Sequence, residues 1–542
     1  MQSELQTSPL STSPLSTLDY EQQRAVDLAI AGKNIFLTGG PGTGKTHTAK
    51  AIVRELKQMY PAGVMVVAPT GIAALNLGGQ TMHSKPGPAM PQGTTDQFRN
   101  VMNSKANRQM WEQVRVIIVD ETSMVCAEFL DWYYASIESM CDPQVIFVGD
   151  FSQLPPVADK YAKSLQSTSY LEQCIETADC ALGNTDVPIP YGTKECTGRY
   201  AFQSRCWRAL DLQTVHLLHV HRTQDGLLLN ALDDLRYGET NTRAVQELVA
   251  STKRELSPIK GVQATVLFPK RLEVCNENRI RLHQLDVGSR HNYIAKDSVL
   301  VQPGAANYTR QDLLGDRFFT KDCQAPLELE LRIGCQVMLL RNESVDECPS
   351  SKDRLVNGSR GVVIRFEAKS GCNSEQPVEW PVVRFLNGRE ETIGPQDFEK
   401  QIYRRGSCLR KQVPLSLAWA ITIHKSQGMS IDFLKVDLKG CFAEGQAYVA
   451  ISRATCLKGL QIANFQPKFV QTNPVILELN TALDADRLAE FVADQPTWWA
   501  DVMRPAQHKW AELYMRNPRF KSWEDSYPQS HGTKRKLSEL DQ

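Results

Sequence analysis

The stretch Asn34–Thr46 reads NIFLTGGPGTGKT, a short apolar run followed at once by a glycine-rich loop. Helical composition then continues from His47 to about Gln58. A strand, a glycine loop and a helix in this order predict a cradle in which backbone N–H groups and the helix N-terminus hold phosphates. Lys45 is expected to reach the β and γ phosphates, and the Thr46 hydroxyl to ligate Mg²⁺. The residues of the cradle are Gly39, Gly40, Pro41, Gly42, Thr43, Gly44, Lys45 and Thr46.

Two further strand-like runs end in polar residues. Val116–Glu121 reads VIIVDE, so Asp120 is suited to hold hydrated Mg²⁺, and Glu121 to orient and deprotonate a water molecule. A water-activating glutamate favours hydrolysis over transfer of phosphate to a substrate hydroxyl. Val145–Val157 reads VIFVGDFSQLPPV, in which Gln153 is a candidate sensor of the γ-phosphate.

The order of runs predicts an α/β protein with parallel sheets. Short β-branched runs alternate with helical stretches from about residue 18 to 157, and again from about 216 to 479, which is typical of βαβ units. Residues 325–408 instead hold short strands separated by Gly and Asn turns, which predict a small inserted antiparallel barrel. We expect a disordered leader (1–17), a first domain (18–215) with an extra insertion at about 158–200, a second domain (216–480) and a C-terminal extension (481–542) with a basic disordered end.

Composition limits the function classes. Lys+Arg and Asp+Glu are both 61, which argues against a nonspecific DNA-coating protein but leaves room for a local basic groove. The apolar runs are too short to span a bilayer, so we expect no membrane association. The first 23 residues contain no Lys or Arg, so neither secretion nor mitochondrial import is supported. The 14 cysteines contain no C-x-x-C pair, so we expect reduced thiols and an intracellular protein, nuclear if the source is eukaryotic.

Eight motifs in this order resemble the Pif (petite integration frequency) family of DNA helicases, in the RecD-like branch of helicase superfamily one. They are GGPGTGKT, APTGIAALNLGGQTMHS, DETSM, GDFSQLPPV, LVNGSRGVV, PVVRFLNG, VPLSLAWAITIHKSQGMSID and EGQAYVAISRA. The resemblance covers about Leu18 to Ala463. It implies two RecA-like motor domains, a barrel like that of the Src-homology-three domain in the second, and a wedge at about 85–110 in the first.

The family's activity is an expectation carried by that resemblance. It implies a motor that uses ATP and Mg²⁺ to move 5′ to 3′ on single-stranded DNA and to unwind forked duplexes, with quadruplex DNA and RNA–DNA hybrids as further substrates. Such enzymes serve replication, repair, recombination or telomere maintenance. Protein partners are not indicated.

The resemblance also assigns roles to residues. Arg222 and Arg453 resemble the two arginines that reach the γ-phosphate from the second domain. Gln427 and Gly428 would complete the nucleotide pocket, and Gln22, just before a predicted helix, is a candidate reader of the adenine edge. The residues expected on the DNA side are Thr70, Gly71, His83, Ser84, His424, Lys425 and Ser426.

Two other functions stay open. GGPGTGKT also resembles the phosphate loops of adenylate kinases, although Glu121, Gln153, the late arginines and the chain length oppose a nucleotide kinase. A nucleotide-gated DNA-binding module that hydrolyses slowly and does not unwind would share the same motifs.

Three further features are interpreted as structural. His216, His219 and His221 lie within six residues, but no nearby carboxylate pair completes a metal site. Four cysteines (Cys174, Cys180, Cys196 and Cys206) lack the close pairing of zinc ligands. The tail interleaves aromatic and basic residues, a pattern suited to stacking on single-stranded nucleic acid, although we favour a helical extension packed on the motor domains. These residues are Trp498, Trp499, Trp510 and Trp523, with Arg504, Lys509, Arg516 and Arg519.

Overall fold

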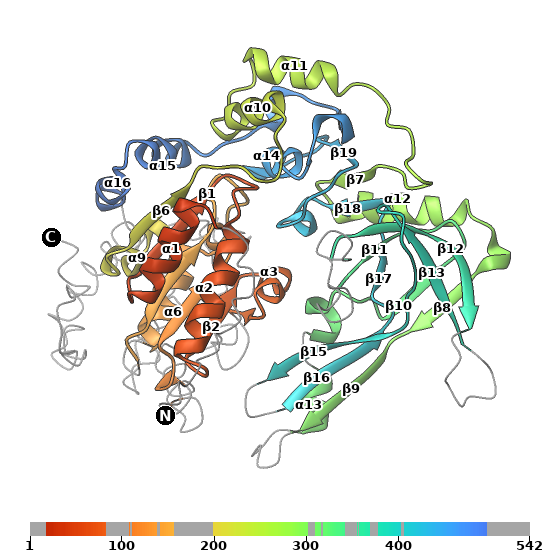
Figure 1. The fold of residues 1–542 in the computed structure, drawn as a ribbon, viewed down its shortest axis with the longest axis horizontal. Helices are drawn as coiled ribbons and strands as arrows, with labels where there is room; N and C mark the ends of the chain where they lie inside the picture. Colours follow the sequence, from red (N-terminus) through yellow and green to blue (C-terminus); the bar gives the residue numbers. More distant parts are fainter. Residues whose placement is uncertain are drawn as a thin grey trace, which may run out of the picture.

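The computed structural model describes residues 18–82, 108, 111–137, 141–156, 199–301, 309–315, 318–341, 355, 357–368, 378–402 and 406–495. Several predictions fall outside these residues. They are the leader, most of the wedge and of the 158–200 insertion, His83, Ser84, three of the four cysteines and the tail tryptophans. Figure 1 shows a first lobe in red and orange, a second lobe above it, and a region of antiparallel strands beside it.

The first lobe is built on a six-stranded sheet in which the paired strands run parallel. Its order across the sheet is β3 (Gln80–Thr81), β2 (Val64–Ala68), β4 (Val116–Val119), β5 (Gln144–Val148), β1 (Ile35–Gly39) and β6 (Gln213–Leu217). Its helices are α1 (Tyr20–Ile30), α2 (Lys45–Met59), α3 (Gly71–Asn76), α6 (Ala127–Ile137) and α9 (Arg205–Ala209). The parallel α/β architecture predicted from the alternating runs is confirmed for this lobe.

Both faces of this sheet are buried, because successive side chains of a strand point to opposite faces. Ile35 and Leu37 belong to the apolar cluster formed with α1 and α2. Phe36, between them, belongs to the opposite cluster, where its ring lies 4.9 Å from that of Trp207. Burial on both sides explains why β1 is an almost continuous apolar run.

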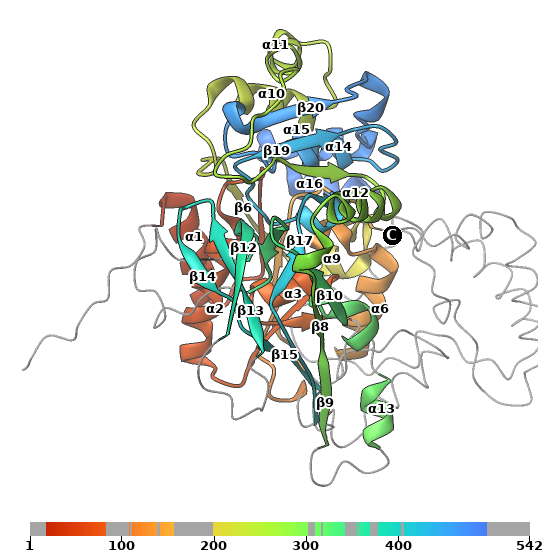
Figure 2. The same cartoon turned by 90° about the vertical axis from the view of Figure 1, so that its right-hand side faces the viewer.

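The second lobe contains a smaller parallel sheet. The strand order is β18 (Ala420–Thr422), β7 (Thr265–Phe268), β19 (Leu434–Asp437) and β20 (Leu460–Ala463). Its helices are α10 (Gly226–Arg236), α11 (Arg243–Ser251), α12 (Arg271–His283) and α14 (Gln446–Ile451). Figure 2 shows α10 and α11 above this sheet and α12 below it.

Antiparallel strands fill much of the chain between β7 and β18. One sheet has the order β14 (Glu390–Thr392), β13 (Glu379–Phe385), β12 (Arg360–Ala368), β11 (Gln336–Leu339) and β17 (Leu415–Leu417). A second has β15 (Gln396–Ile402), β16 (Gly406–Gln412) and β9 (Lys296–Val301), and a third pairs β10 (Glu328–Leu331) with β8 (His291–Ile294). α13 (Arg310–Leu314) lies against β9 and β16. Antiparallel pairing therefore begins at His291, upstream of the expected start at about 325.

The chain returns to the first lobe after the second sheet. α15 (Pro474–Asp484) and α16 (Leu488–Asp494) place Ile476, Leu479 and Leu488 in the same apolar cluster as Phe36. The helical segment that ends the described chain thus belongs to the core of the first lobe, whereas the sequence predicted a second domain that extends to residue 480. Among the described helices, none is long and apolar enough to cross a bilayer.

Candidate nucleotide site

The glycine-rich loop connects β1 to α2 and depends on glycine at defined positions. Gly44 has a φ of +88° and precedes the first residue of α2, and Gly42 has a φ of +86°. A Cβ atom on Gly42 would lie 2.5 Å from the Cβ of Arg222, and one on Gly44 would lie 2.4 Å from Nε2 of Gln22. These positions combine left-handed backbone with close neighbours, so a larger residue would strain the loop.

Lys45 begins α2 and points back along the loop. Its ammonium donates to the carbonyl oxygens of Gly39 at 2.8 Å and Gly40 at 2.9 Å. Burial lowers the pKa of Lys45, and the charges of Asp150 and Glu121 oppose that shift. The loop is further fixed by Thr43, whose hydroxyl donates to Gly40 O at 2.9 Å.

Asp120 and Glu121 follow β4 at the carboxyl edge of the sheet, where ligands of open α/β sheets bind. Burial, with the adjacent charge of Glu121, raises the pKa of Asp120 to about 8. Burial also raises the pKa of Glu121, while Lys45 opposes that shift. A buried carboxylate, Asp120, next to the half-buried carboxylate of Glu121 favours a nearby cation, and their oxygens and the nearby Thr46 hydroxyl are the ligand type that Mg²⁺ prefers. The residues of the site therefore fit this ion.

Glu121 joins the two lobes. Its φ of +51° is unusual for a residue with a side chain, and its Oε2 accepts a hydrogen bond of 2.9 Å from the Gln427 amide. Gln427 follows the turn at His424–Ser426 in the second lobe. A carboxylate held from both lobes is sensitive to their relative position.

Two arginines reach the same cavity. Arg453 follows α14, is 2% exposed and donates to Gln153 Oε1 at 3.1 Å. Arg222 lies on the segment that connects β6 of the first sheet to α10 of the second lobe. It donates to Ser430 Oγ at 3.0 Å and to Ser452 O at 2.7 Å. Burial and the neighbouring charge of Arg453 lower the pKa of Arg222, so this end of the cavity favours an anionic ligand.

Sequence reasoning missed two residues of the polar network behind the cavity. Asp150 accepts from the Gln153 amide at 3.1 Å and lies 3.9 Å from the Arg236 guanidinium. Arg236 also donates to Ser152 Oγ at 3.2 Å. Asp150 stands in the motif GDFSQLPPV, three residues before the predicted sensor Gln153, so this motif could have indicated it. Arg236 on α10 carried no motif.

Gln22 lies against the loop from its other side. The residue is 2% exposed, and its amide donates to Thr43 O at 3.2 Å and lies 3.2 Å from His221 Nε2. Asp19 and Gln22 form reciprocal side-chain hydrogen bonds that cap α1. The capped helix thus positions Gln22 beside the phosphate loop.

These groups meet in a cavity of about 290 Å³ between the lobes. Most of the predicted nucleotide-site residues line this cavity. Five others lie behind the lining and contact lining residues: Gln22, Gly39, Gly40, Thr43 and Gln427. The lining residues are Pro41, Gly42, Gly44, Lys45, Thr46, His47, Asp120, Glu121, Gly149, Gln153, His221, Arg222, Gly428, Ser430 and Arg453. His47, Gly149, His221 and Ser430 were not predicted.

The predicted DNA-side residues that the structure describes lie just after strand ends in both lobes. Thr70 lies between β2 and α3, Gly71 is the first residue of α3, and the Thr70 hydroxyl accepts from Ala73 N at 3.3 Å. His424 and Lys425 follow β18. Ser426 differs from its prediction, because its hydroxyl is buried and donates to Ile423 O at 2.7 Å. It stabilises the turn and does not face solvent.

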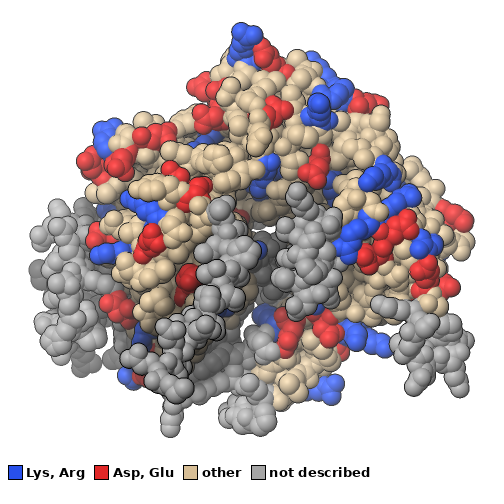
Figure 3. All heavy atoms as spheres, viewed as in Figure 1, with Lys and Arg blue, Asp and Glu red and all other residues tan. Residues whose placement is uncertain are grey.

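An aromatic residue that we did not predict accompanies His424. Phe442 is 60% exposed, and its ring lies 6.5 Å from that of His424 with 20° between the planes. Burial, with the charge of Arg271, lowers the pKa of His424 and of Lys425. On the face drawn in Figure 3, acidic and basic side chains are intermixed, and the surface is hollowed between the first lobe and the antiparallel region.

Family models and curated relatives both match this chain to PIF1-like helicases. The family model for PIF1-like helicase matches residues 17–179, and that for the 2B domain of DNA helicase Pif1 matches residues 320–366. The ATP-dependent DNA helicase PIF1 of Xenopus laevis is 33% identical over 485 residues, which cover 88% of this chain and 66% of the relative. The chain spans slightly less than two thirds of the length of the first curated relatives that it matches.

Solved structures of Pif1 helicases are also similar to this chain. The crystal structure of Pif1 helicase from Candida albicans has a TM-score of 0.64 and 28% identity, covering 86% of this chain and all of that one. Pif1 helicase from Bacteroides in complex with ADP-AlF3 and single-stranded DNA has a TM-score of 0.54 and 25% identity, covering 87% of this chain and 98% of that one.

Proposed function

Because this chain belongs to the PIF1-like helicase family, we propose that it is an ATP-dependent DNA helicase that moves 5′ to 3′ on single-stranded DNA. The observation that carries the proposal is the shared cavity. Lys45, Asp120 and Glu121 of the first lobe line it together with Arg453 of the second. A site completed by both lobes can couple nucleotide hydrolysis to their relative movement.

Several residues at the cavity have proposed roles in hydrolysis. Lys45 and the N–H groups of the loop bind the β and γ phosphates, and Glu121 orients and deprotonates the attacking water. Thr46 and Asp120 would hold Mg²⁺, which when bound neutralises phosphate charge. Gln427 holds the Glu121 carboxylate, so water activation depends on the position of the second lobe.

Arg222 and Arg453 stabilise the charge that develops on the γ-phosphate. Arginines in this role contribute about 10³- to 10⁵-fold to the rate in related phosphoryl-transfer enzymes. Gln153 bridges Arg453 and Asp150, so it can report the state of the γ-phosphate to both lobes. Gln22 reads the adenine edge from the opposite side of the loop.

The DNA strand contacts the carboxyl ends of strands in both lobes. Thr70 and Gly71 offer a hydroxyl and backbone N–H groups to phosphates, and Lys425 offers a cation. His424 and Phe442 present flat side chains for base stacking, which is sequence-tolerant and is worth about 1 to 3 kcal/mol per base. His83 and Ser84, with a duplex-splitting wedge at about 85–110, stay part of the proposal.

We also propose that the antiparallel region includes a barrel like that of the Src-homology-three domain and steers the strand. The match of residues 320–366 to the 2B domain of DNA helicase Pif1 supports this. Forked DNA, quadruplex DNA and RNA–DNA hybrids are the substrates we propose, with roles in replication, repair, recombination or telomere maintenance. A nuclear location is the corresponding proposal for a eukaryotic source.

One experiment separates this function from a nucleotide kinase and from a nucleotide-gated DNA-binding module. ATP turnover is measured with and without a single-stranded oligonucleotide, and strand separation is measured on duplexes with a 5′ or a 3′ tail. We expect DNA to stimulate turnover and unwinding to require the 5′ tail. A kinase would be indifferent to DNA, a gated binder would be stimulated without unwinding, and preference for the 3′ tail would contradict the polarity.

Two substitutions test the site assignment in the same assay. Lys45→Ala removes the phosphate-binding cation and Glu121→Gln removes the base, so each should reduce turnover at least about 10²-fold, the lower range for general-base catalysis. Lys57→Ala, exposed in the last turn of the same helix and outside the cavity lining, is the control and should keep wild-type turnover. Turnover retained in either site variant would refute the assignment.

A further inference from the structure

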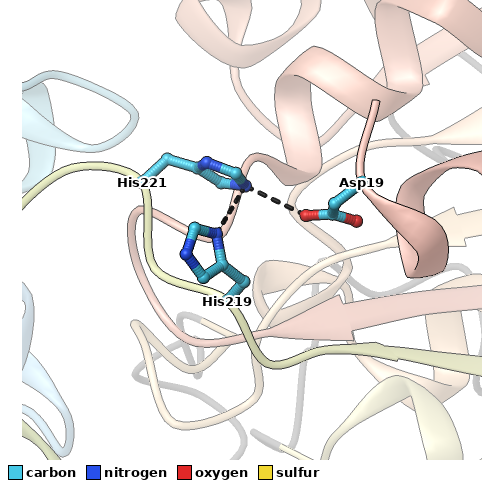
Figure 4. A group of neighbouring side chains, drawn as sticks. All are labelled: Asp19, His219 and His221. Atoms are coloured by element: carbon cyan, nitrogen blue, oxygen red, sulfur yellow. Dashed lines mark hydrogen bonds and ion pairs between the residues drawn. The ribbon is translucent and has the colours of Figure 1, made fainter. Parts of the chain in front are cut away.

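A histidine pair and a carboxylate from distant parts of the chain converge beside the phosphate loop (Figure 4). His221 Nε2 lies 3.0 Å from Asp19 Oδ2 and 3.3 Å from His219 Nδ1. The ligand atoms of all three residues lie within 4.8 Å of one another. The sequence favoured a structural role for these histidines because no nearby carboxylate pair completed a metal site, whereas the fold brings Asp19 to His221 across 202 positions.

The local backbone explains the convergence. Residues 218–221, after β6, belong to no helix or strand, and Figure 4 shows the side chains of His219 and His221 turned toward each other and toward Asp19. His221 N donates to Gly42 O at 2.8 Å, which fixes this segment against the phosphate loop. Asp19 caps α1 with Oδ1, which accepts from Gln22 N at 2.9 Å, and its Oδ2 faces His221. The cap thus leaves one carboxylate oxygen available.

Hydrogen bonding alone does not account for the contacts at His221 Nε2. Asp19 Oδ2, His219 Nδ1 and the Gln22 amide nitrogen all lie within 3.0 to 3.3 Å of it. An imidazole nitrogen carries either one proton or one lone pair, so it can satisfy only one such partner well. A cation placed among Nε2, Nδ1 and Oδ2 would instead accept a lone pair from each.

The distances also match the size of a metal site. Zinc binds imidazole nitrogen and carboxylate oxygen at about 2.0 to 2.2 Å, which places neighbouring ligands of a tetrahedron about 3.3 to 3.5 Å apart. The two shortest separations here, 3.0 and 3.3 Å, need only small side-chain adjustments to reach that spacing. Two imidazoles and one carboxylate are a ligand set that suits Zn²⁺ more than Mg²⁺ or Ca²⁺.

We propose that Asp19, His219 and His221 form a binding site for Zn²⁺ or a similar transition-metal dication, with a fourth position open to water. The site is distinct from the Mg²⁺ position at Thr46 and Asp120, and it goes beyond the proposed helicase function. The side chains of His221 and Asp19 are 43% and 24% exposed, so the ion can enter from solvent. Since His221 also lines the nucleotide cavity, a bound ion joins α1 to one wall of that cavity.

Direct binding tests the site. Zn²⁺ is titrated calorimetrically into the full chain, without a histidine tag or nucleotide and with thiols kept reduced, for wild type, His219→Ala and His283→Ala. His283 is an exposed histidine at the end of α12 and serves as the matched control. We expect His219→Ala to lose one Zn²⁺ equivalent or to weaken it by more than about 10-fold, since loss of even an outer-shell partner costs about 10- to 100-fold. Binding by the cysteines is common to all three proteins and cancels in the comparison.

Thermal stability gives an independent readout, because a ligand that binds the folded state raises the unfolding temperature. Zn²⁺ should raise the Tm of wild type and His283→Ala more than that of His219→Ala. Equal Zn²⁺ binding and equal Tm shifts in the three proteins would overturn the proposal, as would an equal loss in both variants. Neither measurement depends on ATP or DNA, so failure of this site would leave the helicase proposal intact.

Discussion

At Gly44, comparison with a second glycine can separate two effects of an alanine substitution, the strain in the backbone and the clash of its Cβ atom with Gln22. Alanine at a φ of +88° costs about 1 to 2 kcal/mol of folding free energy, and its Cβ would also displace Gln22 from the loop. Gly32 has a φ of +73°, and a Cβ atom there would meet no described atom within 4 Å. We expect Gly44→Ala and Gly32→Ala to lose similar stability in urea unfolding.

Only Gly44→Ala should weaken nucleotide binding, by about tenfold or more, which corresponds to about 1.4 kcal/mol. Titration with a fluorescent ATP analogue measures the difference. Equal nucleotide affinity in the two variants would mean that the Gln22 contact does not shape the site.

The sequence indicated the site residues that stand in a motif, but not the residues that contact them in the folded protein. Lys45, Asp120 and Glu121 were predicted because each stands at the end of a recognisable run. Arg236 was not, because its contacts with Asp150 and Ser152 arise only when α10 packs on the first lobe. Ser426 was assigned to DNA by its motif, and only the turn geometry shows its hydroxyl bonded to Ile423 O.

Helix α15 is the element whose role departs most from the sequence interpretation. It follows the second sheet in the chain, yet Leu479 is 1% exposed within the core of the first lobe. Leu479→Ala should destabilise the protein by about 2 to 5 kcal/mol, the usual cost of truncating a buried leucine. Glu478→Ala on the exposed face of the same helix is the control and should change stability by less than about 0.5 kcal/mol.

Urea unfolding followed by circular dichroism compares the two variants. A small effect of Leu479→Ala would show that α15 is not part of the core of the first lobe.

Apolar runs predicted where strands occur, but they did not predict which strands pair with each other. β1, β4 and β5 coincide with the three apolar runs quoted from the sequence. The predicted boundary between the domains, after residue 215, falls inside β6, which pairs with β1 in the register Ile35↔Gln213. Pairing between segments so far apart depends on tertiary packing, which no local pattern contains. For the same reason β8 and β9 were not assigned to the antiparallel region.

Across the two lobes together, we infer that a cavity completed by both of them hydrolyses ATP when DNA is bound. The contacts between lobes at the cavity include polar pairs, Gln427 with Glu121 and Arg453 with Gln153. Such contacts can break and reform as the lobes move, whereas a large apolar interface would resist that movement.

DNA-stimulated ATP turnover by wild type, Arg453→Ala and the control Arg243→Ala tests this inference. The side chain of Arg243 is 91% exposed on α11, so Arg243→Ala should match wild type. Arg453 reaches the cavity from the second lobe, so its loss should lower kcat at saturating ATP and DNA by about 10³-fold or more. If folded Arg453→Ala keeps full DNA-stimulated turnover, the second lobe does not complete the catalytic site and the proposed coupling is wrong.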